Sequence, residues 1–431
     1  MQLNLQALIM KKNYAFLLLV WSCLMGFGQQ KLDKDIAGIA SKVIEWRRYF
    51  HEHPELSNRE FKTSEKIAEH LKSLGMEVQT GIAKTGVVGL LKGKKEGKVI
   101  ALRADIDALP VTERVDVPFK SEVRSEYLGN ETGVMHACGH DTHIAIMMGV
   151  AEVLSKNNDF AGTIKFIFQP AEEGPPPGEE GGADLMIKEG VLKNPDVEAI
   201  FGLHISAMID VGNISYKPGG TMAAAQEFEI KVQGKQSHGS APWTGVDPIY
   251  VSAKIIDGLQ SIISREMELT NEAAVITVGK ITSGVRHNII PETAEMLGTI
   301  RTLDYDMQKL LNRRMEEMVT TIAKAYKAEA TINIAKGIPI TYNDPDLTAR
   351  TLPSLHKAAG EDHVILTKAV TGAEDFSFFQ EKIPGFYFFL GGKPVDKAPT
   401  QHHTPDFYID ESGMILGVKA FTQIVFDYLG T

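Results

Sequence analysis

Apolar residues recur with different periods along the chain, and each period predicts a type of element. Near the start, five of them follow helical spacing: Ile36, Ile39, Val43, Trp46 and Phe50. This spacing predicts an opening helix. A second helix is predicted from about Lys62 to Leu74, because Gly75 is typical of a helix end.

Four short apolar runs between residues 87 and 203 have the composition of buried strands. They read VVGLL, VIALRA, TIKFIF and VEAIFGL. The stretches HIAIMMGVAEVLSK and GGADLMIKEGVL separate them and have helical patterns. Strands that alternate with helices favour an α/β layer with a mainly parallel sheet.

The pattern changes after Gly219. Strands are predicted at AQEFEIKVQG, AAVITVGKI, AEMLGTIRT and EATINIA, and helices at about Pro248 to Arg265 and Asp306 to Tyr326. Their order is β-α-β-β-α-β, the ferredoxin-like arrangement. We therefore expect a small α+β domain at residues 221–334, inserted between two parts of a larger α/β domain at 29–220 and 335–431.

Residues 1–28 predict a signal peptide. Lys11 and Lys12 precede an apolar run, Tyr14 to Phe27, that is too short to span a bilayer. Cleavage near Gly28 would give an exported chain, periplasmic or secreted. Two alternatives remain: a retained membrane anchor, and a lipoprotein modified at Cys23.

Composition narrows the class of protein. The chain has 431 residues, of which 43% are hydrophobic and 23% charged, as in an ordinary globular protein. The net charge is −10 without a basic block, which argues against nucleic acid as a partner. Removal of the signal would leave Cys138 as the lone cysteine. It is then either a thiolate ligand to a metal or an inert buried residue.

Residues capable of chemistry cluster where the predicted strands end. They are Asp105 and Asp107, then Glu172 and Glu173, then His204. Open α/β sheets bind ligands at the carboxyl ends of their strands, and the loop MHACGHDTH (135–143) lies close to the same edge. Each residue has a structural alternative: a loop cap, a solvated glutamate pair or a structural histidine. Together they form a Cys/His/Glu set that favours zinc or a related transition metal.

These residues belong to longer motifs through which the chain resembles the M20 metallopeptidase family, in its amidohydrolase branch. That branch includes aminoacylases, hippurate hydrolases and auxin-conjugate hydrolases. The motifs run in family order from about residue 45 to 415: RRYFHEHPELSNREFKT, ALRADIDALPVTE, MHACGHDTH, IFQPAEEGPPPGEEGGA, GLHI, GKQSHGSAPWTGVDPI, HNIIPETAEMLGTIRT, TGAEDFSFF and HHTPDFYIDE.

The resemblance implies two divalent metal ions per subunit, Zn²⁺ or Mn²⁺. The implied ligands are Cys138, His140, Glu173, His204 and His403, with His140 bridging the ions. His402 is the neighbour that competes with His403 for the last position. Glu172 falls on the general base, and Asp107 is expected to orient ligands from behind them. Asp105, His136 and His143 receive no role.

The resemblance also implies that the inserted domain is a dimerisation or lid domain, and hence a homodimer. His238 falls on a residue that reaches the substrate across the dimer interface and takes part in catalysis. Asn288, Arg301 and Gly372 fall on further substrate-binding positions.

The function expected is hydrolysis of the amide bond of N-acyl amino acids or similar small amides. A dipeptidase or carboxypeptidase of the same family is the alternative. A metal-dependent binding protein without turnover would need neither Glu172 nor His238, and a structural dimer scaffold would not need the full ligand set.

Overall fold

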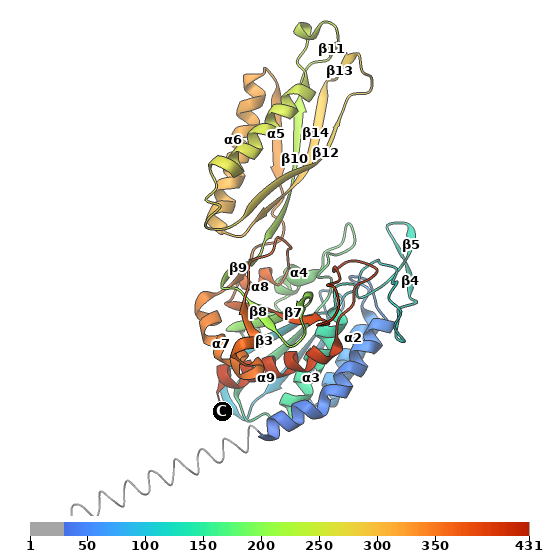
Figure 1. Ribbon diagram of the computed structural model, residues 1–431, viewed down its shortest axis with the longest axis vertical. Coiled ribbons are helices and arrows are strands. Elements are labelled where there is room, and N and C mark those ends of the chain that lie inside the picture. Colours follow the sequence, from blue (N-terminus) through green and yellow to red (C-terminus); the bar gives the residue numbers. More distant parts are fainter. Residues whose placement is uncertain (1–29, 431) are drawn as a thin grey trace, which may run out of the picture.

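A computed structural model describes residues 30–430 of the chain (Figure 1). The predicted signal peptide, its predicted cleavage point and Cys23 lie outside the described residues. The described residues form a large domain and a small one, joined where the chain crosses between them (Figure 1). Within residues 30–430, no helix is both long and apolar enough to cross a membrane.

The large domain is built on an eight-stranded sheet with strand order β1-β2-β6-β3-β7-β18-β8-β17. Its four central strands are parallel: β6 (Ala161–Gln169), β3 (Lys95–Asp105), β7 (Ala199–Asp210) and β18 (Gly385–Lys393). On one side, β2 (Gly86–Lys92) and β1 (Glu77–Ile82) continue the sheet antiparallel. On the other, β8 (Ile214–Tyr216) is antiparallel to β18, and β17 (Val364–Leu366) is parallel to β8.

Helices cover both faces of this sheet. One face carries the helix at residues 30–52, α2 (Phe61–Ser73), α3 (His140–Lys156), α7 (Pro345–Ala359) and α9 (Met414–Leu429). The other carries α4 (Gly182–Lys188) and α8 (Ser377–Gln380). Along β6, Phe166 and Phe168 pack on the first face while Ile167 packs on the second. The strands are apolar on both faces because both are covered, and the expected α/β class is confirmed.

The small domain has its own four-stranded antiparallel sheet, in the order β12-β14-β10-β15. The strands are β10 (Ala224–Gln233), β12 (Ala274–Ser283), β14 (Thr293–Thr302) and β15 (Glu329–Ile334). Helices α5 (Pro248–Arg265) and α6 (Tyr305–Ala325) pack on one face and form a separate hydrophobic core with it. The ferredoxin-like element order is as expected; the domain limits at 221 and 334 stay a prediction.

Local signals explain where the two long helices of the small domain begin. The Asp247 carboxylate accepts hydrogen bonds from the backbone N–H groups of Ile249 and Tyr250, and Pro248 occupies the first helical position of α5. Asp304 caps α6 in the same way. An acceptor at the cap satisfies N–H groups that have no partner in the helix, so both helices start close to their predicted positions.

Short elements complete the fold. They are β4 (Arg124–Tyr127) with β5 (Asn130–Gly133), β9 (Gly219–Met222) with β16 (Thr341–Asn343), β11 (Ser237–His238) with β13 (Ile289–Ile290), and 3₁₀ turns at Pro242–Thr244, Glu361–His363 and Glu411–Gly413. The β4–β5 and β11–β13 pairs were not expected, because two to four residues carry too little periodicity to predict a strand.

Candidate metal centre

The MHACGHDTH loop is pressed against β7 where it enters helix α3. Gly139 precedes the helix with a φ of 94°, and a Cβ atom at this position would lie 2.3 Å from Cγ2 of Ile205. Only glycine permits both this backbone conformation and this close approach. The loop therefore brings Cys138 and His140 next to His204 on β7.

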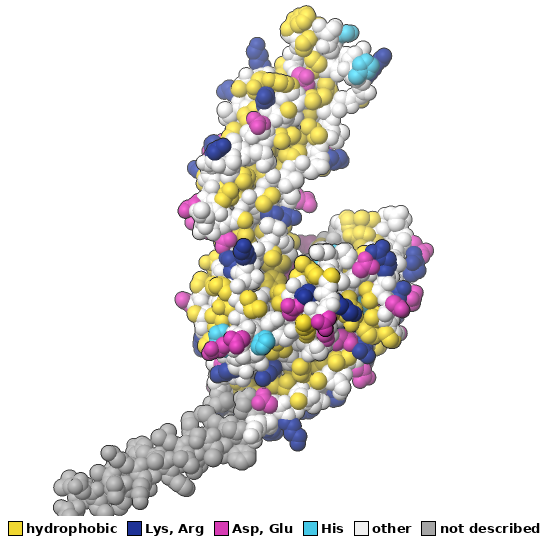
Figure 2. All heavy atoms as spheres, viewed as in Figure 1, with side chains coloured by type: hydrophobic (Ala, Val, Ile, Leu, Met, Phe, Trp, Pro, Cys, Tyr) yellow, Lys and Arg dark blue, Asp and Glu magenta, His cyan; other side chains and the backbone are white. Residues whose placement is uncertain are grey.

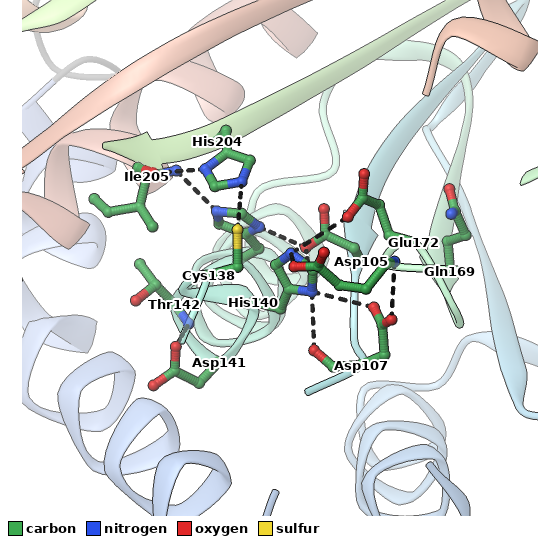
Figure 3. Close-up of polar contacts among 12 residues, drawn as sticks. Asp105, Asp107, Cys138, His140, Asp141, Thr142, Gln169, Glu172, His204 and Ile205 are labelled. Carbon is green, nitrogen blue, oxygen red and sulfur yellow. Dashed lines mark hydrogen bonds and ion pairs between the residues drawn. The ribbon is translucent and has the colours of Figure 1, made fainter. Parts of the chain in front are cut away.

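Three neighbouring strands supply the remaining residues of the site (Figure 3). Asp105 ends β3 and Asp107 follows it, Glu172 and Glu173 follow β6, and His204 lies on β7. Strand β3 pairs in parallel with both β6 and β7, so their carboxyl ends lie at one edge of the sheet. The structure thus gathers the three polar clusters that the sequence placed at strand ends.

Potential ligand atoms lie close together around Cys138. Its Sγ atom is 3.3 Å from Nε2 of His204 and 3.2 Å from Nε2 of His403. Oε1 of Glu173 lies 3.1 Å from the same His403 nitrogen and 3.9 Å from Nε2 of His140. Three groups with the spacing of metal ligands share members: Cys138/His140/His204, Cys138/Glu173/His403 and His140/Glu172/Glu173. Overlapping groups of this kind suit two adjacent ions better than one.

Unpartnered buried atoms indicate that these residues fit metal ions. Nε2 of His140 is buried and makes no hydrogen bond, and the buried Oε1 of Glu173 has only ion-pair contacts, to His403 and His140. The Nδ1–H group of His140 donates to the carbonyl and carboxylate oxygens of Asp107, at 2.9 and 3.1 Å, so Nε2 is the ring nitrogen that can bind a metal ion. His204 donates from Nδ1 to the Ile205 carbonyl at 2.6 Å with the same result. Metal-binding histidines are held in this way, and the S, N and O donors suit zinc.

The two adjacent histidines His402 and His403 lie differently. Nε2 of His402 accepts a hydrogen bond from the Ala207 N–H at 3.2 Å, and its Nδ1 is 3.7 Å from the Cys138 sulfur. His403 makes the shorter contacts described above, and its backbone N–H donates to the Ala137 carbonyl at 2.8 Å. The geometry favours His403 as the ligand and His402 as a wall of the site.

Asp107 forms hydrogen bonds with two of the proposed ligand residues, His140 and Glu173. Besides its bonds to His140, its Oδ2 accepts hydrogen bonds from the Ser57 hydroxyl at 2.7 Å and from the Glu173 N–H at 3.1 Å. Its carboxylate therefore fixes an imidazole ligand and the backbone of a carboxylate ligand at once. Its place behind the ligands agrees with the orienting role expected of it.

Asp105 and His143, which received no role from the sequence, form a second support. Oδ2 of Asp105 accepts from Arg103 at 2.5 Å, and Oδ1 accepts from Nδ1 of His143 at 2.5 Å. Nε2 of His143 in turn accepts from the Ile205 N–H at 2.8 Å. This chain of bonds fixes β7 directly after His204. His136 is buried beneath the site, and neither of its ring nitrogens has a partner.

Glu60 is a supporting residue that the sequence did not single out. Its carboxylate accepts hydrogen bonds from the Ala171 N–H at 3.0 Å and from the Thr85 hydroxyl at 2.6 Å. Ala171 has a φ of 53°, a strained conformation for a residue other than glycine. Burial and the nearby Asp107 charge raise the pKa of Glu60 to about 8. Glu60 thus holds the turn from which Glu172 and Glu173 diverge; its only sequence signal was its place in the NREF segment.

Several carboxylates lie close together around Glu172. Burial, and then the charges of Glu374 and Glu173, raise the pKa of Glu172 well above its usual value. Burial and the charges of Glu173 and Glu172 likewise raise the pKa of the Cys138 thiol. A divalent cation among these groups would reverse both shifts, because it favours the ionised forms.

Three of the expected substrate-binding residues belong to the small domain and do not line the cavity of this centre. His238 lies on β11 at the far end of that domain (Figure 1). Asn288 is beside it, since its carbonyl accepts from the Gly239 N–H at 2.8 Å. Arg301 lies on β14 and lines a separate hollow on the sheet. Only Gly372 lines the cavity of the metal centre.

Comparisons with known proteins agree with this geometry. The profile of peptidase family M20/M25/M40 matches residues 101–427. A thermostable carboxypeptidase 2 of Saccharolobus solfataricus is 41% identical, over 93% of this chain and 98% of its own. An N-acetylcysteine deacetylase of Bacillus subtilis is 36% identical, over 91% and 98%. The crystal structure of a Bacillus subtilis dinuclear metal-binding peptidase from the M20 family, 34% identical, superposes with a TM-score of 0.77 over 91% of this chain and 99% of that one.

The different surroundings of Glu172 and Glu173 generate a prediction. Glu173→Gln should lower the bound metal, because an amide oxygen replaces a charged ligand. Glu172→Gln should retain metal and lose at least about a hundredfold in turnover, the scale of a lost general base. Metal analysis and kcat of the two purified variants test this. If the two phenotypes are exchanged, the roles are reversed.

Proposed function

The chain belongs to peptidase family M20/M25/M40, and from that premise we propose that it is a metal-dependent hydrolase of carbon–nitrogen bonds, an amidohydrolase that cleaves N-acyl amino acids or similar small amides. The main support for the proposal is that Glu172 and Glu173, which are adjacent in one turn, have different neighbours. Both line the cavity, but Glu173 groups with Cys138 and His403, whereas Glu172 groups with Glu374 and Asp375.

Amide hydrolysis needs an activated water, a polarised carbonyl and a proton for the leaving amine. Cys138, His140, Glu173, His204 and His403 would hold two divalent ions, which would supply Lewis acidity and lower the pKa of a bound water towards neutrality. Glu172 takes the proton of the attacking water on its carboxylate and returns it to the nitrogen as the amine leaves.

The cavity has the dimensions of a small-molecule site. It measures about 450 Å³ and is lined by Cys138, Glu172, Glu173, His204 and His403. Residues from the two segments through which the chain enters and leaves the small domain also line it. Ligand pockets of enzymes fall in this range. The thiolate and imidazole ligands favour zinc, while carboxylates also accept manganese.

A carboxypeptidase activity is the second candidate. It is favoured by the 41% identity to a thermostable carboxypeptidase. Both activities use the same centre and differ in whether the acyl side of the scissile bond is a simple acyl group or a peptide.

The function is tested by amino-acid release. Metal-loaded protein should release free amino acid from N-acetyl and N-benzoyl amino acids, and a chelator should abolish release until Zn²⁺ or Mn²⁺ is restored. Benzyloxycarbonyl-dipeptides tested alongside measure carboxypeptidase activity. Hydrolysis of the dipeptides alone would favour the second candidate, and activity that survives complete metal removal would contradict both.

We further propose a homodimer in which His238 of one subunit serves the active site of the other. Within one chain, β11 points away from the large domain, at the end of the small domain farthest from it (Figure 1). His238 is exposed, and its Nδ1 is engaged with Ser240, so Nε2 is free to meet a substrate oxyanion. An isologous dimer would place each His238 at the partner's centre.

Mixing two inactive variants tests this arrangement. His238→Ala and Glu172→Gln should each retain their fold and lose most activity. After random subunit exchange, about half of the dimers are mixed, and each mixed dimer has one intact site, so activity should return to about a quarter of wild type. Exchange is verified first with subunits labelled by two fluorophores. Exchange without recovery would show that His238 does not act across the interface.

We also propose that the chain is exported after removal of the N-terminal segment. The support is the pair Lys11 and Lys12 before the apolar run that ends at Phe27. N-terminal sequencing of the protein from its native host should find a start near Gln29 in the fraction outside the cytoplasm. An intact Met1 or Met10 in the cytosol would contradict export, and a lipidated Cys23 would instead indicate attachment to a membrane surface.

A further inference from the structure

A buried histidine behind the metal centre has no part in the chemistry proposed above. His51 lies at the end of the helix at residues 30–52 and is buried. Its Nδ1 atom is 2.8 Å from Oδ2 of Asp141, and its Nε2 atom is 3.0 Å from Oε1 of Glu113. Neither partner is a proposed metal ligand. His51 therefore joins three segments that are distant from one another in the sequence.

The geometry favours a proton on both ring nitrogens of His51. A carboxylate oxygen is an acceptor, and so is a ring nitrogen without a proton. Two acceptors 2.8 Å apart would repel, so each nitrogen donates to the carboxylate that it faces. Burial and then the Arg47 charge lower the pKa of His51, but its hydrogen bonds to Asp141 and Glu113 outweigh them and raise that pKa above its usual value.

The charges of this network balance when His51 is protonated. Besides His51, the network contains two arginines and three carboxylates: Arg47, Arg48, Asp141, Glu113 and Glu411. His136 also lies near Asp141, but burial lowers its pKa to about 3, so it is neutral. On the face of the large domain seen in Figure 2, acidic and basic side chains are interspersed, and salt screens exposed charges. The buried pairs therefore decide the charge of His51, and loss of its proton leaves one buried carboxylate uncompensated.

The Asp141 side of this network holds the loop that carries two of the ligands. Asp141 follows His140 directly in the first turn of α3, and its carboxylate points away from the ligands (Figure 3). Besides its bond to His51, it forms an ion pair with Nε of Arg47 at 2.8 Å. The N-cap residue of α3 is a glycine, which has no side chain to cap the helix. The position of this helix end, and with it that of Cys138 and His140, therefore depends on the bonds to Asp141.

The Glu113 side of the network reaches the segment of the last ligand. The residue after Glu113, Arg114, donates its backbone N–H to the Pro405 carbonyl at 2.9 Å. Pro405 is two residues beyond His403. His51 thus connects the two segments that carry ligands from opposite ends of the large domain's sequence.

We propose that His51 is a positioning residue of the metal centre. As an imidazolium between two carboxylates, it fixes the loop at residues 138–141 relative to the segment of His403. It keeps only one of its two bonds when it loses its proton, so its contribution to metal retention is lost at high pH. The inference rests on the proposed metal centre and is independent of which amide is hydrolysed.

The direction of the shift sets the pH range of this effect. The pKa of His51 in the folded chain lies above the value of about 6.5 that it has in the unfolded chain. Its contribution is then complete below about pH 6.5 and is lost as the pH rises through the folded pKa.

Two uncharged variants each keep one of the two bonds. The amide nitrogen of asparagine lies near the place of Nδ1, so His51→Asn keeps a donor to Asp141. The amide nitrogen of glutamine lies near the place of Nε2, so His51→Gln keeps a donor to Glu113. His70→Gln is the matched control, because Nε2 of His70 donates to the Met148 carbonyl at 3.1 Å, on α3 but beyond its first turn.

The rate of zinc loss to excess chelator tests the proposal, measured on the zinc-loaded mature protein at several pH values. At about pH 6, both His51 variants should lose zinc at least about tenfold faster than wild type, the factor expected from one hydrogen bond to a charged group. His70→Gln should match wild type. Above about pH 9, wild type should approach the His51 variants, because a neutral imidazole also keeps a single N–H. Taking the ratio to wild type at each pH removes the pH dependence of the chelator and the ligands.

The outcomes separate this inference from the metal centre on which it rests. Equal rates of zinc loss at every pH would overturn the positioning role and leave the metal centre intact. A lowered melting temperature of the metal-free variants with unchanged zinc loss would show that His51 only stabilises the fold. A rate ratio that does not change with pH would overturn the role of the imidazolium. Protein that binds no zinc at any pH would overturn both. Circular dichroism verifies folding, and His51→Asn carries the test if His51→Gln does not fold.

Discussion

The crowding of carboxylates at one buried edge of the sheet is the constraint on which the rest of this structure depends. Asp105, Asp107, Glu374 and Asp375 are almost fully buried there, next to the partly exposed Glu172 and Glu173. Like charges in a closed space repel strongly unless cations separate them. The chain supplies one such cation from β3, the buried Arg103, which binds Asp105 at 2.5 Å and Glu374 and Asp375 at 2.9 Å.

Arg103 forms ion pairs with carboxylates on only one side of this cluster. On the other side, Glu173 faces Cys138, His140 and His403, and Nε2 of His140 is buried there without a hydrogen-bond partner. The distribution of charge thus explains why the metal ligands gather on one flank and the proposed base on the other. Burial raises the pKa of Asp375 to about 8, although the charge of Arg103 lowers it. Arg103 therefore does not fully offset the cost of burying the carboxylates on its own side. Two divalent metal ions would balance the negative charge of these carboxylates.

The supports behind the centre keep its geometry from relaxing. Glu60 holds the Ala171 turn, Asp107 connects His140 with the Glu173 backbone, and His143 ties Asp105 to β7. Each support bridges segments that are distant in sequence. The small domain contributes differently, since its crossing strands supply part of the cavity wall while its far end carries His238 away from the same subunit's centre.

The sequence by itself determined the elements and the set of chemical groups. Two hydrophobic periods, the apolar strands and a helix-end signal, Gly75, were local signals, and they predicted both layers and the inserted ferredoxin-like arrangement. The ligand types at strand ends predicted the position of the centre, because parallel strands end at one edge. Only the tertiary structure connected Glu60 to Ala171 and gave Asp105 and His143 a supporting role. It alone brought Met222 and Ile338, more than a hundred residues apart, into the lining of one cavity. These facts depend on distances between segments that the chain brings together only when it folds, and no local pattern encodes them.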